Sequence, residues 1–186
     1  MAEAHAVRTL PVLASAAGWR TLDARSCWSL RVDLATAAAP VATAGLPLSV
    51  DACRAVTMGD WSALWLGPDE QLLVGPHAAH AQLAPRLAPA LDGIAHSLVD
   101  VSHRQAAIEL TGDAATTLLA TGCPLDLDAS VAPVGFCTRT VYAKAEVVLW
   151  RQAPQQFQLQ AWRSFLPYVT GLLALGSREL AANQNL

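Results

Sequence analysis

Short apolar runs separated by turn residues follow one another from Trp61 to Leu180, and their order restricts what the chain can fold into. The runs predict the order β-β-α-β-β-α-β-β-β-α. Neighbouring strands joined by short turns pair antiparallel, whereas parallel strands need a long crossover connection. Because the strands come in groups between helices, the sequence predicts an α+β fold of mostly antiparallel sheets with short helices, and not a Rossmann sheet.

The strand predictions rest on alternation and on turn residues. The runs "WSALWL" and "EQLLVGP" flank Gly67-Pro68-Asp69, which predicts a hairpin. Further strands are predicted at 97–103 and 106–112, and three more within 137–152 and 156–162.

Three helices are predicted after residue 61. Leucines at helical spacing mark 77–91, although two prolines make that helix irregular or broken. A short helix over 114–122 is expected to be capped by Asp113 and to end at its glycine. An amphipathic helix over 164–180, capped by Ser164, closes the pattern.

The pattern is weaker before residue 61. A strand is predicted at 27–34, and the following "ATAAAPVATAGLPLS" has the composition of a loop. We therefore expect residues 1–60 to form an N-terminal segment that packs on, or extends from, a domain of residues 61–186. The stretch 10–19 resembles a secretion leader, but an upstream Glu3 and an internal Pro11 oppose that interpretation, and a cytoplasmic protein is expected.

Charge is scarce in this sequence. Charged residues make up 15% of the 186 residues, hydrophobic residues make up 53%, and there are six tryptophans. An average globular chain is about one quarter charged. Two explanations remain open: a surface that partner proteins cover, for which Trp61, Trp65, Trp150 and Trp162 are candidates, or an alanine-rich genome bias. The net charge of −3, without a basic stripe, argues against nucleic acid as a partner.

The sequence lacks the common cofactor and catalytic motifs. It contains no GxGxxG after a strand, no GxSxG and no HExxH, and "GLLALGSR" has P-loop glycine spacing without the lysine. His77 and His80 stand at helical spacing without a third ligand, which favours a solvated helix face over a metal site. The four cysteines form no CxxC, so buried free thiols in a reducing compartment are expected.

The octapeptide "TGCPLDLD" (121–128) offers a possible nucleophile, Cys123, and two possible metal ligands, Asp126 and Asp128. A calcium loop starting at Asp126 fails at its required glycine and glutamate positions. No local base accompanies Cys123, although His103 is a candidate in space. A helix exit into an ordered loop accounts for more of the stretch, so no catalytic or metal-binding residue is assigned here.

The stretch "VDVSHRQ" (99–105) places Asp100, Ser102 and Arg104 on one face of a predicted strand. These three side chains are weak candidates for a folate cleft. A solvated or partner-facing edge is the other interpretation.

Four segments in order, "LWLGPDEQLLV", "VDVSHRQAAIELTGDAATTLLATGCPLDL", "VVLWR" and "RSFLPYVTGLL", together resemble the gamma subunit family of heterotetrameric sarcosine oxidase. The resemblance covers about two thirds of the chain, and the helix exit "GCPLDL" is among its more specific marks. Thr121 stands where a lysine is common in the family. The first sixty residues match only weakly.

The resemblance implies a fold like the folate-binding domain of glycine cleavage aminomethyltransferase. It also implies a cytoplasmic complex that oxidatively demethylates sarcosine to glycine, with alpha, beta and delta subunits as partners. In that complex the alpha subunit carries NAD and tetrahydrofolate, the beta subunit carries the flavins (FAD and FMN) and the delta subunit carries zinc. The gamma subunit has no assigned cofactor or catalytic residue.

Two classes of function follow. The first is a non-catalytic subunit of sarcosine oxidase, or of a related N-methyl amino acid dehydrogenase such as that for N-methylglutamate. The second is a free-standing folate-binding or one-carbon-transfer protein that uses the cleft of its fold.

Overall fold

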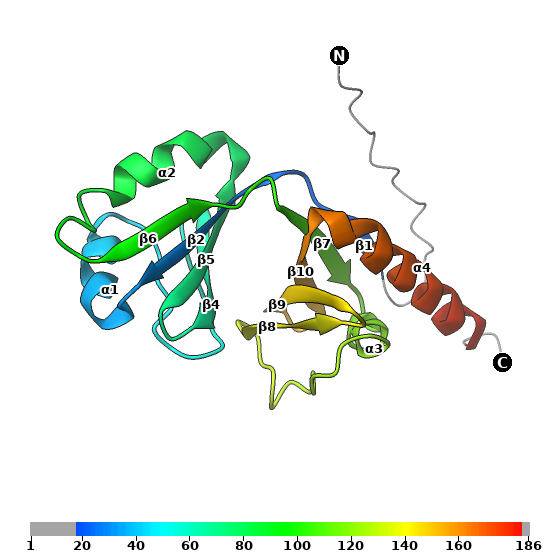
Figure 1. The fold of residues 1–186 in the computed structure, drawn as a ribbon. Coiled ribbons are helices and arrows are strands. Elements are labelled where there is room, and N and C mark those ends of the chain that lie inside the picture. The colour runs from blue at the N-terminus through cyan, green and yellow to red at the C-terminus, as the bar shows by residue number, and fades with distance from the viewer. Residues whose placement is uncertain (1–17, 184–186) are drawn as a thin grey trace, which may run out of the picture.

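The computed structural model describes residues 18–183, which form two five-stranded antiparallel sheets lying side by side (Figure 1). In spatial order, sheet A contains β1 (Gly18–Thr21), β7 (Gln105–Thr111), β10 (Gln156–Trp162), β9 (Ala145–Ala153) and β8 (Cys137–Tyr142). Sheet B contains β3 (Ala55–Met58), β4 (Trp61–Gly67), β5 (Glu70–Pro76), β2 (Arg25–Val32) and β6 (His96–Asp100).

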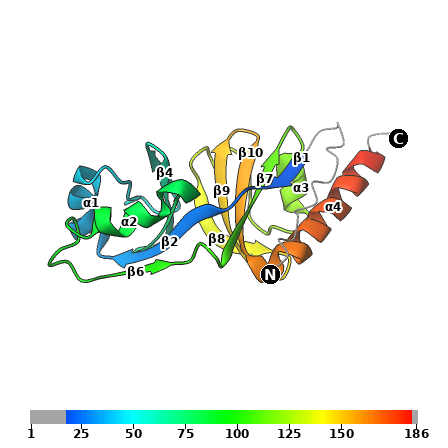
Figure 2. The ribbon, with the colours of Figure 1, turned by 90° about the horizontal axis from the view of Figure 1, so that it is seen from above.

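Each sheet has its own helices. Those of sheet B are α1 (Leu34–Thr43), the one-turn 3-10 helix η1 (His77–Ala79) and α2 (His80–Leu87). Those of sheet A are α3 (Ala115–Ala120), the one-turn 3-10 helix η2 (Arg163–Phe165) and α4 (Leu166–Asn183). Figure 2 shows the two sheet-and-helix layers as separate halves of an elongated molecule. We call these halves lobe A and lobe B.

The order of elements after Trp61 is the predicted one, and the α+β fold class is confirmed. The hairpin at 67–69 joins β4 to β5, with a register shift between Trp65 and Gly67. The 77–91 stretch is broken as expected, since α2 ends at Leu87 and turns that contain Pro89 follow, whereas Pro85 is accommodated inside the helix.

The predicted loop after residue 34 is wrong, because α1 occupies Leu34–Thr43. Asp33 caps this helix by accepting a hydrogen bond from the Ala35 amide, and the alanines favour helix strongly enough to accommodate Pro40 in its second half. Leu34, Ala37 and Val41 bury the face that packs on sheet B.

The two predicted capping residues are also wrong. The N-cap of α3 is Ala114, one residue after Asp113, and no side chain makes a capping hydrogen bond there. Ser164 lies inside η2, whose flanking residue is Trp162, so the C-terminal helix starts as a 3-10 turn and not at a serine cap. Side-chain caps compete with backbone turns at helix ends, and here the backbone turns prevail.

The described part of the expected N-terminal segment, residues 18–60, contributes to both lobes. β1 joins sheet A beside β7, while β2 and β3 join sheet B. The predictions for residues 1–17, which include most of the leader-like stretch 10–19, lie outside the described residues, and the boundary at residue 60 stays a prediction. Within the described residues, no helix has the length and apolarity that crossing a membrane requires.

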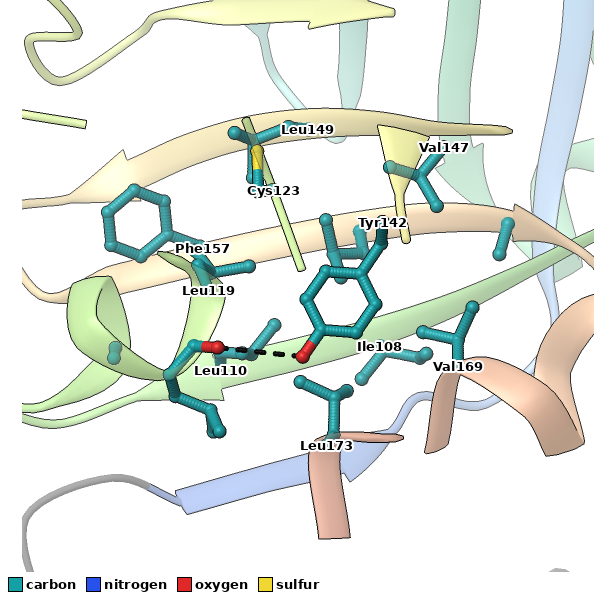
Figure 3. Packing of buried hydrophobic residues seen from close by; sticks show 14 of the residues in the cluster. Ile108, Leu110, Leu119, Cys123, Tyr142, Val147, Leu149, Phe157, Val169 and Leu173 are labelled. Atoms are coloured by element: carbon teal, nitrogen blue, oxygen red, sulfur yellow. Dashed lines mark hydrogen bonds between the residues drawn. The ribbon is translucent and has the colours of Figure 1, made fainter. Parts of the chain in front are cut away.

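The core of lobe A lies between its sheet and α3 and α4 (Figure 3). Tyr142 sits fully buried among Ile108, Val169 and Leu173. Its hydroxyl bonds the Thr121 hydroxyl at 2.9 Å. The same hydroxyl lies 3.5 Å from the Leu118 carbonyl. A polar atom in a core needs such partners, so Tyr142 ties β8 to the end of α3.

Another buried hydrophobic cluster lies where the two lobes meet. It packs Leu64, Leu72 and Val74 of sheet B against Cys137 and Val148 of sheet A, with further members around them. A backbone bond from the Cys137 amide to the Cys53 carbonyl also crosses this junction. The two lobes are therefore packed against each other and are not independent domains.

Candidate functional site

The polar residues that the sequence singles out lie in the turn between β6 and β7, where the chain passes from lobe B to lobe A (Figure 1). Asp100 is the last residue of β6, and its Oδ1 accepts a hydrogen bond of 2.9 Å from the Ser102 amide. This bond turns the chain, so the predicted strand stops three residues early. Asp100, Ser102 and Arg104 therefore do not share a strand face, which corrects that expectation.

His80 joins Asp100 and Ser26 in one hydrogen-bonded group. The His80 Nε2 lies 3.3 Å from Asp100 Oδ2, and its Nδ1 lies 3.1 Å from Ser26 Oγ. The ring stacks on Trp28 with centroids 5.1 Å apart, and the Trp28 indole donates to Ser26 Oγ. His80 is half-buried, so the solvated helix face that the sequence suggests describes the exposed His77 but not His80.

The proton positions in this group follow from the partners. A carboxylate only accepts, so when the His80 ring is neutral its hydrogen lies on Nε2 and is donated to Asp100. His80 Nδ1 is then an acceptor, and the Ser26 hydroxyl donates to it. Ser102 is also engaged, since its hydroxyl accepts from the Cys27 amide at 2.9 Å and faces the Cys27 carbonyl at 3.2 Å.

The group contains serine, histidine and aspartate, but its geometry does not support nucleophilic catalysis. Ser26 is fully buried, and its oxygen already accepts the indole hydrogen of Trp28. A triad serine must instead face a substrate carbonyl while its histidine takes the proton. Here the three side chains connect the start of α2 to β2 and β6, and their hydrogen-bonding capacity is used inside lobe B.

Two opposing effects act on the Asp100 carboxyl. Desolvation raises its pKa, but the hydrogen bonds from Ser102 and the neighbouring His80 and His103 rings lower it by more, so the pKa lies below its ordinary value. Asp100 is therefore an anion held by fixed donors at neutral pH, and it is not set up as a proton donor.

Arg104 points to a different neighbour. Its guanidinium lies over the Trp162 ring, 5.1 Å from the centroid, and its backbone carbonyl accepts a 2.7 Å bond from the Arg163 amide. The structure thus divides the three candidate residues: Asp100 and Ser102 belong to lobe B, whereas Arg104 belongs to the exposed start of the C-terminal helix of lobe A.

The octapeptide 121–128 is a helix exit, as predicted. Cys123 and Leu127 are buried in the core of lobe A, while Asp126 and Asp128 are exposed and accept bonds from backbone amides two residues further on. Burial raises the pKa of the Cys123 thiol. His103 is exposed in the β6–β7 turn and does not accompany it. Neither a nucleophile nor a metal site results.

All four cysteines are free, and Cys27, Cys123 and Cys137 are buried as expected, whereas Cys53 is half-buried. Burial raises the pKa of Cys27 and of Cys137 to about 12, so both are protonated at neutral pH. Among residues 18–183, no group of three His, Cys, Asp or Glu side chains is arranged to hold a metal ion.

Sequence reasoning missed several buried polar residues, among them Ser26 and Arg151. Ser26 and Trp28 are two apart on β2, and this spacing places them on one face beside His80. Arg151 is 6% exposed and donates to the carbonyls of Leu127, Ala132 and Pro154. Val147, Leu149 and Arg151 alternate towards the core, a pattern that would have marked the arginine as inward-facing.

The arrangement of the sheets and helices identifies the fold of this protein. The structure superposes on glycine cleavage aminomethyltransferase T from Bartonella henselae with a TM-score of 0.59 at 13% identity, over 86% of this chain and 45% of that one. At that identity the likeness concerns the fold alone. The fold is thus an α+β fold like that of the aminomethyltransferase, as the family resemblance implies.

The chain belongs to the sarcosine oxidase gamma subunit family, whose model matches residues 30–179. It is 33% identical over 138 residues to the sarcosine oxidase subunit gamma of Corynebacterium sp. (strain P-1), covering 74% of this chain and 66% of that protein. The subunit gamma of Arthrobacter sp. is 36% identical over 113 residues, covering 61% and 54%. The chain therefore spans less than two thirds of the length of these relatives.

A solved structure agrees with the family. A chain of the heterotetrameric sarcosine oxidase from Corynebacterium sp. U-96, in complex with pyrrole 2-carboxylate, matches with a TM-score of 0.78 at 28% identity. The match covers 88% of this chain and 84% of that one.

Proposed function

We propose that this chain is the gamma subunit of a heterotetrameric oxidase that demethylates sarcosine oxidatively to glycine, and that it serves assembly and not turnover chemistry. The observation that carries the proposal is the match, over 88% of the chain, to a chain of a heterotetrameric sarcosine oxidase. Family membership over residues 30–179 supports it.

The geometry of the polar groups supports a non-catalytic role. The polar groups of the site form hydrogen bonds with one another and with the backbone of lobe B; they belong to Ser26, His80, Asp100 and Ser102. Cys123 is buried with a raised pKa. Oxidation of an amine requires a redox cofactor such as a flavin. In this proposal FAD, FMN, NAD, tetrahydrofolate and zinc are bound by alpha, beta and delta partner subunits, in the cytoplasm.

The direct test is co-expression of the three other subunits with and without this chain. We expect soluble, flavin-loaded complex only when the chain is present, measured by size-exclusion chromatography and flavin absorbance. When increasing amounts of the chain are added to the other three subunits, the amount of complex should rise, but the turnover per bound flavin should stay constant. A fully assembled and active oxidase that lacks this chain would refute the proposal.

The second candidate is a folate-binding or one-carbon-transfer protein, which the aminomethyltransferase-like fold favours. Calorimetric titration of the isolated chain with tetrahydrofolate separates the two. We expect negligible binding of tetrahydrofolate and none of flavin, because the Asp100 carboxylate already holds the Ser102 amide and His80. Micromolar binding that disappears in Asp100→Ala would favour the folate protein. Oxidation assays of the complex with sarcosine and with N-methylglutamate would separate those two substrates.

A further inference from the structure

An exposed row of aromatic side chains marks the start of the C-terminal helix. Trp162 ends β10, Phe165 lies in η2 and Tyr168 lies in the first turn of α4, with exposed fractions of 40%, 38% and 38%. Residues three apart lie above one another in a 3-10 turn and stay close in an α-helix. Together with Arg104, which lies over the Trp162 ring, they form what we call the aromatic surface.

The aromatic surface is held in place by the backbone. Trp162 pairs with Gln105 in the register of sheet A, and the Arg163 amide donates to the Arg104 carbonyl at 2.7 Å. Arg104 and Trp162 are therefore fixed relative to each other before any partner arrives. A preorganised surface loses less conformational entropy on binding, and Trp, Tyr and Arg dominate the binding energy of protein interfaces.

The charges around the aromatic surface are positive, although the chain carries a net charge of −3. Arg104 and Arg163 are exposed there, and no ion pair among residues 18–183 involves either of them. The nearby carboxylate, Asp100, is engaged by Ser102 and His80. A partner that presents carboxylates therefore complements this surface.

The charge also disfavours a second copy of the chain as the occupant. In a two-fold symmetric dimer the same patch meets itself, so the positive charges of Arg104 and Arg163 in one copy would face those of the other copy. Like charges placed opposite one another oppose association.

We propose that the aromatic surface of Arg104, Trp162, Phe165 and Tyr168 docks onto an oxidase subunit, against carboxylate side chains that surround an apolar socket. This inference rests on the proposed function and assigns it a particular contact. The arginine pairs with the carboxylates, and the three rings fill the apolar socket.

The test measures binding of the purified chain to the complex of the other three subunits by biolayer interferometry. We expect Arg104→Glu and the double change Phe165→Ser with Tyr168→Ser each to weaken the affinity at least 30-fold. The matched control is Arg178→Glu, an exposed arginine further along α4, which should stay within twofold of wild type. Thermal melting of each variant checks that the fold persists. Raising the salt concentration should weaken the wild type more than Arg104→Ala.

The outcomes separate the inference from the proposed function. Wild type and variants that bind equally well would overturn the docking surface and leave the gamma-subunit function intact. A wild-type chain that does not bind the other subunits at all would refute both. Concentration-dependent self-association that Arg104→Glu abolishes would overturn the inference in favour of a contact between copies of the chain.

Discussion

Glu70 of sheet B and Arg139 of sheet A form an ion pair across the two lobes, with Arg139 Nη2 lying 2.8 Å from Glu70 Oε1. Glu70 also accepts from Arg31 on the neighbouring strand β2, at 3.0 Å. Desolvation raises the pKa of the Glu70 carboxyl, but the bonds and charges of Arg139 and Arg31 outweigh it and hold the pKa below its ordinary value of 4.5. The carboxylate is thus an electrostatic link between the lobes.

The first prediction concerns acid. A carboxyl whose pKa is lowered by folding stabilises the protein above its unfolded pKa, and that stability is lost as the pH falls through the folded pKa. Glu70→Gln should cost about 1 kcal/mol of unfolding free energy at pH 7, because Arg139 is partly exposed. The cost should vanish at pH values below the folded pKa of Glu70. Urea denaturation across pH measures it.

The control for this prediction is Asp69→Asn, whose exposed carboxylate lies 3.8 Å from Arg31. It should change stability by a few tenths of a kcal/mol at most. A Glu70→Gln cost that does not depend on pH would contradict the electrostatic link.

The second prediction concerns Arg151, which supplies hydrogens to three carbonyls and lies over the Phe157 ring. Arg151→Met keeps an apolar stem but leaves buried acceptors without donors, so we expect a loss of about 3 kcal/mol or more in unfolding free energy. Urea denaturation measures this loss. The exposed Arg178→Met should cost less than about 0.5 kcal/mol. Equal losses of unfolding free energy for the two changes would show that Arg151 does not stabilise the loop that contains Leu127 and Ala132.

The third prediction tests the helix exit at Gly122. A Cβ added there would lie 2.9 Å from a ring carbon of Tyr142, which is fully buried and cannot retreat. Gly122→Ala should therefore destabilise the protein by about 1–3 kcal/mol in thermal or urea melts. Gly171→Ala in α4 meets no atom within 4 Å and should stabilise it by up to about 1 kcal/mol. A neutral Gly122→Ala would exclude the packing explanation.

The fourth prediction concerns the thiols. Cys27, Cys123 and Cys137 are buried, and Cys53 is half-buried. Because the thiolate is the reactive form, a pKa of about 12 slows the reaction of Cys27 and Cys137 with a disulfide reagent at neutral pH. We expect Cys53 to react first in the native protein, and all four thiols to react after denaturation without reductant. A denatured count of two would indicate a disulfide, and a fast phase that persists in Cys53→Ser would reject the order.

The elements that are predictable from sequence are those with a clear period. The hairpin of β4 and β5, the paired β9 and β10 and the leucine-rich α2 each carry their own local signal. The helix α1 carries no such signal, because a stretch of alanines interrupted by Pro40 is as typical of a loop as of a helix. Its structure depends on Asp33 at its start and on packing against sheet B, and packing is a tertiary effect.

The site is less predictable than the fold, because it joins residues far apart in the chain. Asp100 and Ser102 are visible as a polar pair, but His80 reaches them from α2 and Ser26 from β2. Likewise Trp162 stands out as an aromatic residue, whereas its contact with Arg104 depends on how β10 pairs with β7. Local patterns identify such residues, and only the register of the strands shows which of them meet.

The position of β1 has a consequence for the order in which the protein is made. β1 is the edge of sheet A, yet its neighbour β7 follows the whole of sheet B in the chain (Figure 2). A ribosome releases β1 early, so this strand must wait while β2 to β6, a continuous stretch, emerge and pair. Lobe B can thus form during synthesis, whereas lobe A closes only after its last strands have appeared. Until β7 emerges, β1 has no partner strand, so the order of synthesis sets when this edge strand is paired.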